Sequence, residues 1–367
     1  MTTWYSNSPA RQWVTTAPPV DTLAFHQSLP RYAETPLVSL PSLAAELGVA
    51  HVVVKQESSR LGLPAFKILG ASYAVARALS AHLGSSEVLP LAELRERHAS
   101  SGLSIVAATD GNHGRAVAHM AALLGVPAHI FVPSSITTAA QRAIAGEGAE
   151  LTVLDIPYDD VVQHAREIAG TRGALLVQDS SWPGYTDVPG WIVDGYSTLF
   201  READAQLAAL GLPAASLVTV PTGVGALAVA AVDHYRRGSS DAPVVLVVEP
   251  DTAPCVITSL HAGEMVAVTT GNTIMNGLNC GVVSPGAWPP MRDGVDAAIT
   301  VTDDGARLAV HDLAALGVDS GPCGASSLAA VRALCASPDR RLDTGITADS
   351  VLLLLSTEGL AANPLPS

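Results

Sequence analysis

The chain has 367 residues, of which 48% are hydrophobic and only 15% are charged, so it is long enough for one large or two ordinary globular domains and too apolar to be disordered. Its formal net charge of -14 at pH 7 argues against a nucleic-acid backbone or an anionic membrane as the main partner, because both need clustered Lys and Arg. The longest apolar runs have only the length of a strand and do not predict a membrane span.

Short runs of Leu and β-branched residues alternate with longer Ala-rich stretches from about residue 100 onward. Strands are predicted at 104–108, 128–132, 151–154, 174–178, 216–220, 244–248 and 351–355. Helices are predicted between them, at 114–124, 137–146, 159–169, 190–210, 225–237 and 305–316. Strands without internal alternation that are separated by helices form parallel sheets covered on both faces. The pattern therefore predicts an α/β fold.

Three segments interrupt this alternation. Residues 81–102 are predicted to form a polar connection, and 179–190, which contains two prolines and two glycines, is predicted to be irregular. Segment 262–296 is also long and poor in periodicity. Because a long irregular segment in a compact α/β protein tends to be functional, this last segment is a candidate for part of a site.

The N-terminal run and the cysteines both bear on the compartment in which the protein works. The N-terminal run MTTWYSNSP has neither a basic start nor an apolar core, so no signal peptide is predicted. The four cysteines lie far apart without paired spacing, which argues against a metal site or a disulfide framework and favours a reducing cytoplasm. These residues are Cys255, Cys280, Cys323 and Cys335.

Lysine is rare in this chain, which contains only Lys55 and Lys67. Lys67 lies in the run PAFKILG (64–70), directly before a predicted Ala-rich helix. Apolar surroundings lower the pKa of a lysine towards a free, nucleophilic amine, which is the form that a Schiff-base lysine needs. The alternative is a helix-start lysine whose charged end reaches solvent. The scarcity of lysine favours the first interpretation.

Two polar turns follow predicted strands, where open α/β sheets bind their ligands. The first, TDGNHG (109–114), precedes a helix whose first amide groups could hold a carboxylate, although an ordinary helix cap with an Asx turn explains it equally well. The second, PTGVGAL (221–227), has glycines that let the backbone approach a phosphate. It lacks the Rossmann glycine spacing and the Walker lysine, so neither nucleotide-binding motif fits.

Two further strand ends carry side chains with possible chemistry. Asp179, in QDSSWPGY (178–185), is a carboxylate beside aromatic residues and is either an acid or base with a shifted pKa or only a turn cap. Ser356 and Thr357, in LSTEG (355–359), offer hydroxyl groups that could face a ring nitrogen. A simple strand-end turn is the alternative for these two residues.

Taken in order from about residue 30 to 359, these runs resemble diaminopropionate ammonia-lyase. That family belongs to the fold-type II pyridoxal-phosphate enzymes, which include threonine dehydratase and the tryptophan synthase β-subunit. The aspartate before Gly-Asn-His, where the wider fold type has serine, is specific to the lyase. The resemblance is carried by the segments ESSRLGLPAFKILGASYA, TDGNHGRAVA, VQDSSWPGYTDVPGWIVDGY, GVGALA, VVEPD, TIMNGLNCG and STEG.

The resemblance implies a site for pyridoxal 5'-phosphate. Lys67 would bind the cofactor as a Schiff base, and Asn112 would hydrogen-bond its ring oxygen. The cofactor's phosphate would be cradled by Gly223, Val224, Gly225, Ala226 and Leu227. Its pyridine nitrogen would face Ser356, with Thr357 as the second candidate. The implied substrate site consists of Thr109, Asp110, Gly111, His113 and Asp179.

The implied reaction is the elimination of ammonia from D- or L-2,3-diaminopropionate, with the cofactor as electron sink. It gives aminoacrylate, which hydrolyses to pyruvate and a second ammonia. The implied catalytic residues are Lys67, which would take the Cα proton, Asp110, which would be the base for the D-enantiomer, and Asp179. Asp110 and Asp179 together suit a substrate that carries a second ammonium group.

The chain departs from the family pattern at several positions. Asn276 and Asn279 replace small residues in TIMNGLNCG, Pro322 replaces the Glu of Ser-Gly-Glu-Ser-Gly, and Leu360 replaces an Asp. The Asn side chains could bind a different substrate. The alternative is therefore a dehydratase, ammonia-lyase or β-replacement enzyme acting on another β-substituted amino acid. A non-catalytic relative is disfavoured because Lys67 and the glycine loop are both present.

The resemblance also implies two open, twisted parallel-sheet domains with the cofactor in the cleft between them. Residues 81–212 are expected to form a small inserted domain, and residues 1–80 with 213–367 the large cofactor-binding domain. A homodimer is the implied assembly, and a small amino acid the implied partner.

Overall fold

The computed structural model describes residues 2–99, 101–239 and 241–366. The strands in this part of the chain are β1 (Trp4–Ser6), β2 (Leu37–Ser39), β3 (His51–Gln56), β4 (Ile105–Ala108), β5 (Ala128–Pro133), β6 (Glu150–Leu154), β7 (Leu175–Leu176), β8 (Leu217–Pro221), β9 (Val244–Pro250), β10 (Ala297–Val301) and β11 (Val351–Ser356). The α-helices are α1 (Leu23–Gln27), α2 (Pro41–Leu47), α3 (Lys67–His82), α4 (Leu91–His98), α5 (Asn112–Leu124), α6 (Thr138–Gly146), α7 (Tyr158–Arg172), α8 (Asp187–Ala209), α9 (Ala226–Tyr235), α10 (Cys255–Ala262), α11 (Trp288–Gly294), α12 (Asp303–Ala315), α13 (Pro322–Cys335) and α14 (Pro338–Thr344). Two short 3-10 helices are η1 (Ser8–Gln12) and η2 (Asn276–Leu278).

The described strands form two sheets. The larger has seven strands in the order β1-β10-β9-β8-β11-β3-β2, and the smaller has four in the order β6-β5-β4-β7. All neighbours are parallel except the two edge pairs of the larger sheet, β1 with β10 and β2 with β3. The α/β fold with two parallel sheets is therefore confirmed.

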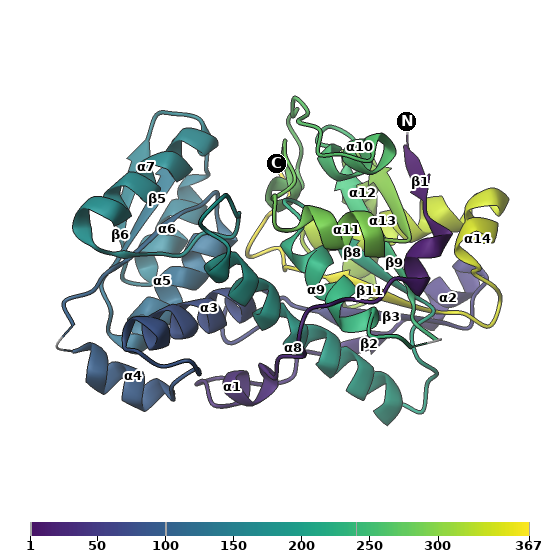
Figure 1. The fold of residues 1–367 in the computed structure, drawn as a ribbon. Helices are drawn as coiled ribbons and strands as arrows, with labels where there is room; N and C mark the ends of the chain where they lie inside the picture. Colours follow the sequence, from purple (N-terminus) through teal and green to yellow (C-terminus); the bar gives the residue numbers. More distant parts are fainter. Residues whose placement is uncertain (1, 100, 240, 367) are drawn as a thin grey trace.

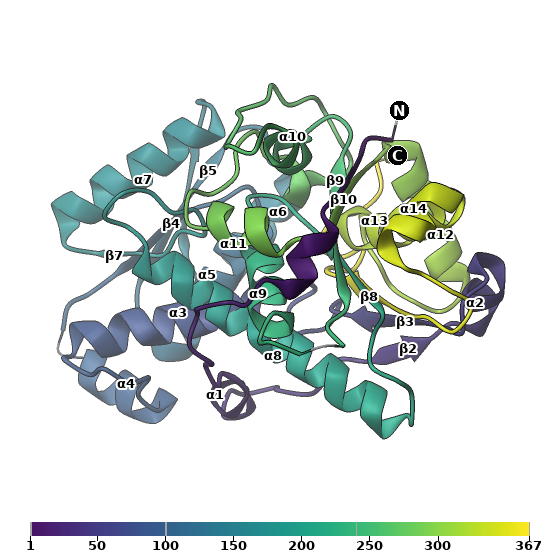
Figure 2. The same cartoon turned by 45° about the vertical axis from the view of Figure 1, so that its right-hand side comes forward.

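The central strands of the larger sheet are buried from end to end. Strands β8, β9 and β11 have no exposed position, as expected for strands that helices cover on both faces. Figures 1 and 2 show these helices on either side of the larger sheet, and show the smaller sheet in a separate lobe with α5, α6 and α7. The polar turns at the strand ends of the two sheets can therefore lie opposite one another.

Helices α3 and α8 cross closely at the start of α3. A Cβ atom added at Gly70 would lie 2.6 Å from Cε1 of Tyr196, and one added at Gly195 would lie 2.5 Å from the carbonyl oxygen of Leu69. The two backbones approach to this distance only because both positions are glycine. The crossing fixes the position of the first turn of α3, and therefore the direction in which the side chain of Lys67 points.

The structure corrects several expectations about single elements. The predicted polar connection 81–102 contains helix α4, whose eight residues bury only two side chains and so give almost no apolar signal. The predicted strand 174–178 is reduced to the two residues of β7, although the N–H of Val177 still donates to the carbonyl oxygen of Val106 in β4 at 2.8 Å. Segment 262–296 is irregular except for η2 and α11. Strands β1, β2, β3 and β10 were not predicted.

The placement of the two sheets supports a division into domains. All strands of the smaller sheet lie between residues 105 and 176, and all strands of the larger sheet lie outside 81–212. We propose that 81–212 is the small inserted domain and that 1–80 with 213–367 is the large one. Helix α3 runs across the proposed boundary at residue 81, packs against α5 and α8, and would join the two units.

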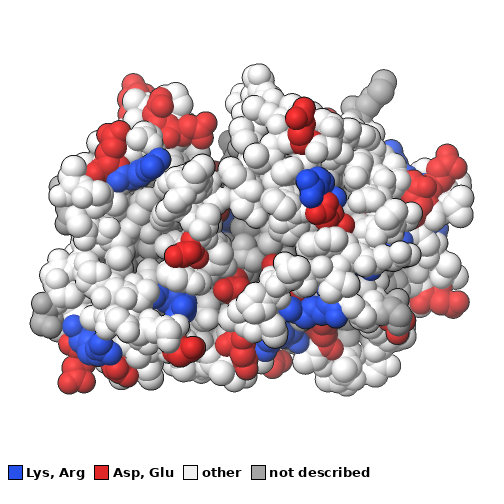
Figure 3. All heavy atoms as spheres, viewed as in Figure 1, with Lys and Arg blue, Asp and Glu red and all other residues white. Residues whose placement is uncertain are grey.

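Charged side chains are scattered over the face seen in Figure 3, with uncharged surface between them and no large basic patch. No helix in the described residues is sufficiently long and apolar to span a membrane.

Candidate active site

Lys67 is the first residue of α3 and is held by the last strand of the chain. The backbone N–H of Phe66 donates to the carbonyl oxygen of Thr357 at 3.0 Å, and the N–H of Gly359 donates to the carbonyl oxygen of Pro64 at the same distance. The residues before the lysine therefore run antiparallel to those that follow β11. This pairing brings two of the predicted motifs, PAFKILG and LSTEG, side by side.

The second lysine, Lys55, is structural. Its Nζ donates to Glu202 at 2.7 Å, and Glu202 also accepts from Arg60 at 2.6 Å; all three side chains are completely buried. A lysine enclosed in such an ion network cannot reach a ligand. Of the two lysines, only Lys67 has a partly exposed side chain that faces other predicted site residues.

The ammonium group of Lys67 forms an ion pair with Asp179. Lys67 Nζ lies 3.0 Å from Asp179 Oδ2, and the two side chains are 21% and 12% exposed. Burial acts to lower the pKa of Lys67, as the sequence predicted, but the interactions with Tyr196 and with the carboxylates of Asp179 and Asp110 outweigh it and raise the pKa. The expectation of a lowered pKa is therefore wrong for the lysine paired in this way. Burial likewise acts to raise the pKa of Asp179, and Lys67 more than reverses it, so the pKa of Asp179 is lowered.

Asp110 behaves differently from Asp179. The residue is exposed and forms no ion pair with any described residue, although its carboxyl group lies near both Asp179 and Lys67. The surrounding protein, which replaces part of its water, and the like charge of Asp179 raise the pKa of Asp110 to about 6, against the opposing effect of Lys67. Two carboxyl groups with separated pKa values in one site are a common arrangement for distinct catalytic roles.

The turn that carries Asp110 is held by Thr109. The buried hydroxyl of Thr109 accepts the backbone N–H groups of Gly111 at 2.9 Å and Gly114 at 3.0 Å, so it caps the first turn of α5 from two residues before the N-cap residue, Gly111. Because Thr109 makes the cap, the Asp110 side chain is free for another role. His113 is buried beside it, with Nε2 2.9 Å from the carbonyl oxygen of Val177.

The glycine loop lies between β8 and α9. A Cβ atom added at Gly223 would lie 2.9 Å from Sγ of Cys280, and one added at Gly225, which has a φ of 108°, would lie 2.5 Å from Sδ of Met291. The loop is therefore closely packed and needs glycine at both positions. The first N–H groups of a helix have no partner within the helix and attract anions. The first helical residues here are Ala226 and Leu227, and Gly223, Val224 and Gly225 form the loop that leads into them.

Ser356 is the last residue of β11 and has a hydroxyl group without a partner. The residue is 1% exposed, and its Oγ makes no hydrogen bond with any described residue. A buried hydroxyl in that state lacks an interaction that a bound group with a polar atom could supply. Thr357, the second candidate, is also buried, and its backbone carbonyl is the group that holds Phe66.

The loop that carries Asp179 is tied to the other lobe. The N–H of Ser181 donates to Oγ of Ser284 at 2.9 Å. On its other side, the N–H of Gln178 donates to the hydroxyl of Tyr185 at 2.9 Å. Asp179 is thus fixed from both directions, although the sequence predicted only an irregular segment here.

These residues fit pyridoxal phosphate by the chemistry that they offer. A lysine stands at a helix start, a glycine loop without room for side chains precedes another helix, and a buried hydroxyl without a partner ends the strand between them. They match in turn the aldehyde, the phosphate and the ring nitrogen of that cofactor. No cluster of three or more His, Cys, Asp or Glu side chains that could hold a metal ion occurs in the described part of the chain.

Sequence reasoning missed four side chains of this site. Tyr158, Tyr196 and Cys280 have pKa values raised mainly by burial. The charge of Asp179 adds to this rise in all three, whereas the charge of Lys67 opposes it in Tyr196 and Cys280. They lie in two helices and an irregular segment with no local motif. Glu358 belonged to the LSTEG run, but nothing in the sequence indicated that its carboxylate accepts a hydrogen bond from Asn112 at 2.8 Å.

The structure also shows the surroundings of the residues that depart from the family pattern. The Asn276 amide donates to Oδ1 of Asn363 at 3.0 Å, and Asn279 is exposed. Pro322 is the first residue of α13, where its missing N–H costs no helical hydrogen bond. The carboxylate of Glu358 accepts the N–H of Cys323 at 3.3 Å, so a carboxylate still stands at this helix start.

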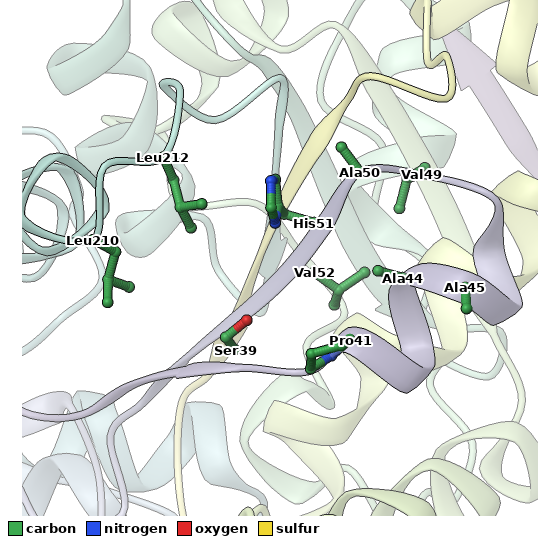
Figure 4. A pocket seen from close by; sticks show the side chains of 10 residues that line it. All are labelled: Ser39, Pro41, Ala44, Ala45, Val49, Ala50, His51, Val52, Leu210 and Leu212. Atoms are coloured by element: carbon green, nitrogen blue, oxygen red, sulfur yellow. The ribbon is translucent and has the colours of Figure 1, made fainter.

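A hollow of about 570 Å³ lies elsewhere, along α2, β3 and the segment after α8. Figure 4 shows its lining side chains, which are mostly small and apolar with His51 and Ser39 among them. None of the predicted site residues lines this hollow.

Residues 29–357 match the family described as Pyridoxal-phosphate dependent enzyme. The chain is 36% identical to the diaminopropionate ammonia-lyase of Salmonella typhimurium over 358 residues, which cover 92% of this chain and 88% of that protein. It is 37% identical to the enzyme of the same name from Escherichia coli over 350 residues, which cover 91% and 86%. The crystal structure of the Escherichia coli diaminopropionate ammonia lyase in complex with an aminoacrylate-PLP azomethine reaction intermediate superposes with a TM-score of 0.86 at 33% identity, covering 98% of this chain and 94% of that one.

Proposed function

Because the chain belongs to the pyridoxal-phosphate-dependent enzymes and, among them, to the diaminopropionate ammonia-lyases, we propose that it eliminates ammonia from 2,3-diaminopropionate. The observation that carries this proposal is the group of one reactive lysine and two carboxyl groups, in which Lys67 pairs with Asp179 at 3.0 Å and Asp110 stays unpaired. A substrate with two ammonium groups complements this charge pattern, whereas serine and threonine carry only one.

The cofactor would be held at three points. Lys67 would bind its aldehyde carbon, the loop from Gly223 to Leu227 its phosphate, and the Ser356 hydroxyl its ring nitrogen. Bound pyridoxal phosphate supplies an electron sink for the electrons that remain when the Cα proton is removed. A hydroxyl partner does not protonate the ring nitrogen as a carboxylic acid would, which favours prompt elimination.

Lys67 and Asp110 would be the bases. With pyridoxal phosphate bound, the Lys67 amine would be the group that takes the Cα proton of the L-enantiomer. Asp110, with a pKa of about 6, is mostly ionised at neutral pH and can take that of the D-enantiomer. While Lys67 is bonded to the cofactor it would no longer pair with Asp179 as a free ammonium group, which would leave Asp179 to bind the substrate's β-ammonium group.

The proposed reaction is an α,β-elimination followed by hydrolysis. The Cα–H bond and the Cβ–N bond break, a Cα–Cβ double bond forms, and the β-nitrogen leaves as ammonia. The remaining aminoacrylate takes up water and gives pyruvate and a second ammonia. Each molecule of diaminopropionate therefore yields one pyruvate and two ammonia.

The test combines labelling with stoichiometry. The purified holoenzyme is reduced with borohydride, and the pyridoxyl-labelled peptide is mapped; the label is expected on Lys67 and not on Lys55, which its ion network encloses. Pyruvate and ammonia are then measured with both enantiomers of diaminopropionate and with serine and threonine. Two ammonia per pyruvate from diaminopropionate supports the proposal. Turnover of serine or threonine alone would instead indicate a dehydratase.

We further propose that the enzyme is a cytoplasmic homodimer. The four cysteines are all free thiols, which suits a reducing compartment, and enzymes that it resembles are commonly homodimers. Sedimentation analysis of the holoenzyme tests the dimer, and cell fractionation tests the compartment.

A further inference from the structure

Glu358 lies in a pocket of hydrogen-bond donors. Its Oε2 accepts from Nδ2 of Asn112 at 2.8 Å, and its Oε1 accepts from Nδ2 of Asn363 at 3.1 Å and from the backbone N–H of Cys323 at 3.3 Å. The glutamate is 3% exposed, and no described Lys, Arg or His forms an ion pair with it. Three donors and no cation around a buried carboxylate call for a function other than charge neutralisation.

The contact with Asn112 fixes which end of that amide faces the glutamate. A carboxylate oxygen can only accept, so the amide must turn its NH₂ group towards Glu358 and its carbonyl away from it. The NH₂ group has a second N–H bond, about 120° from the first, which is left for another acceptor. In the proposed function, Asn112 hydrogen-bonds the cofactor's ring oxygen, and that oxygen needs a donor.

Asn363 holds the other carboxylate oxygen of Glu358. Asn363 is 5% exposed, donates to the carbonyl oxygen of Ile274 at 3.0 Å as well as to Glu358, and accepts from Asn276 at 3.0 Å. Asn276 is one of the residues that depart from the family pattern. The run Asn276, Asn363, Glu358 and Asn112 thus connects the irregular segment after α10 to the first residue of α5 in the other lobe.

We propose that Glu358 is a positioning residue that keeps the Asn112 amide turned with an N–H group towards the cofactor's ring oxygen, and that Asn363 holds Glu358 in place. The proposal rests on the proposed function, because it takes the cofactor to lie at Lys67. Glu358 acts only through Asn112 and need not touch the cofactor.

The main variant is Glu358→Gln, which keeps the shape and replaces one acceptor oxygen with an NH₂ group. The new NH₂ group must face either Asn112 or the pair of Asn363 and Cys323, so two donors meet. We expect the dissociation constant of pyridoxal phosphate, measured by quenching of protein fluorescence during titration of the apoprotein, to rise roughly tenfold. The pH at which the absorbance band of the bound cofactor changes should shift as well, because its ring oxygen loses a donor.

The control is Glu249→Gln. Glu249 is another buried glutamate with backbone N–H partners, Val256 and Ile257, at 2.7 Å each, and it caps α10 rather than contacting the site residues. This variant should lose stability to a similar extent and keep both the affinity for the cofactor and the pH of its spectral change. A general loss of stability would move both variants alike.

A double-mutant cycle with Asn112→Ala separates positioning from an independent effect. If Glu358 acts through Asn112, adding Glu358→Gln to Asn112→Ala changes the dissociation constant by less than about twofold. Additive effects of the two substitutions would overturn the proposal. If Glu358→Gln does not fold, Asn363→Ala replaces it in the cycle, with a smaller expected loss of affinity.

Failure of this inference differs from failure of the proposed function. Wild-type affinity and an unshifted spectrum in Glu358→Gln, with the label still on Lys67, would overturn the positioning role alone. Absence of a label on Lys67 in the unsubstituted holoenzyme would overturn the proposed function and this inference together.

Discussion

The pKa of Asp110 leads to a quantitative prediction about the two enantiomers of diaminopropionate. With a pKa of about 6, Asp110 is about 90% ionised at pH 7 and about 10% ionised at pH 5. If Asp110 is the base for the D-enantiomer, kcat/KM for that enantiomer should fall about tenfold between these pH values through this group alone. An aspartate with the ordinary pKa of 3.8 would lose less than about a tenth of its ionised form over the same range.

The measurement is the ratio of kcat/KM for the D-enantiomer to kcat/KM for the L-enantiomer, followed from pH 5 to pH 8. Both enantiomers have the same pKa values in solution, so the ionisation of the free substrate cancels in the ratio. Ionisation of the cofactor before substrate binds also cancels. What remains is the difference between the groups that remove the proton, for which we expect a ratio that rises with pH and levels off above about pH 7.

Two variants check the assignment. Asp110→Asn should lower the activity on the D-enantiomer by a factor of about 100 or more and leave the L-reaction much less affected. Asp194→Asn is the control, because burial and Asp233 raise the pKa of Asp194 also to about 6, in helix α8 away from the proposed bases. A ratio that does not change with pH, or one whose pH dependence survives in Asp110→Asn, would refute the reasoning.

Three further predictions follow from other parts of the site and the core. Gly223→Ala should weaken cofactor binding at least about tenfold in a fluorescence titration, because the added Cβ meets a sulfur atom and a carbonyl oxygen, while Gly146→Ala, which has open space, should not. Ser356→Ala should leave the apoprotein as stable as before in urea, because the hydroxyl has no partner to lose, yet shift the absorbance of the bound cofactor; a clear loss of apoprotein stability would contradict this. Glu202→Gln should lower the free energy of unfolding by about 3 kcal/mol, since burial acts to raise the pKa of Glu202 but two buried cations hold it at about 2. Because the pKa of Glu202 is lowered, the stability contributed by its ionised carboxylate should be complete above about pH 4.5 and fade as the pH falls towards 2. Equal urea midpoints of the unsubstituted protein and Glu202→Gln at pH 7 would contradict this prediction.

The sequence predicted the fold and the site residues that follow long buried strands. Strands β8, β9 and β11 are continuous apolar runs ended by polar or glycine turns, so both their type and the position of the functional turns could be read. Strand β1 has three residues and pairs only at an edge, and α4 presents only two buried side chains. Elements of this kind form through tertiary contacts, and their local sequence carries little signal.

Electrostatics within the site could not be predicted for a similar reason. The sequence predicted chemistry for Lys67, but the pKa of this lysine depends on Asp179, 112 residues away, and on Tyr196 in another helix. The role of Glu358 depends on Asn112 and Asn363, which meet only because β11 ends beside α5 and the chain then folds back. Distances between side chains far apart in sequence are set by packing, which local patterns do not encode.

The position of β11 in the larger sheet has a consequence for biosynthesis. This strand, the last of the chain to be made, lies between β3 and β8, and without it the β2–β3 pair has no connection to the rest of the sheet. A nascent chain on the ribosome can form the smaller sheet and the β8–β9–β10 portion early. The segment before Lys67 obtains its partner only when residues 357–359 have left the exit tunnel. Cofactor capture by this protein should therefore wait until the segment 357–359 has been made and has folded against the residues before Lys67.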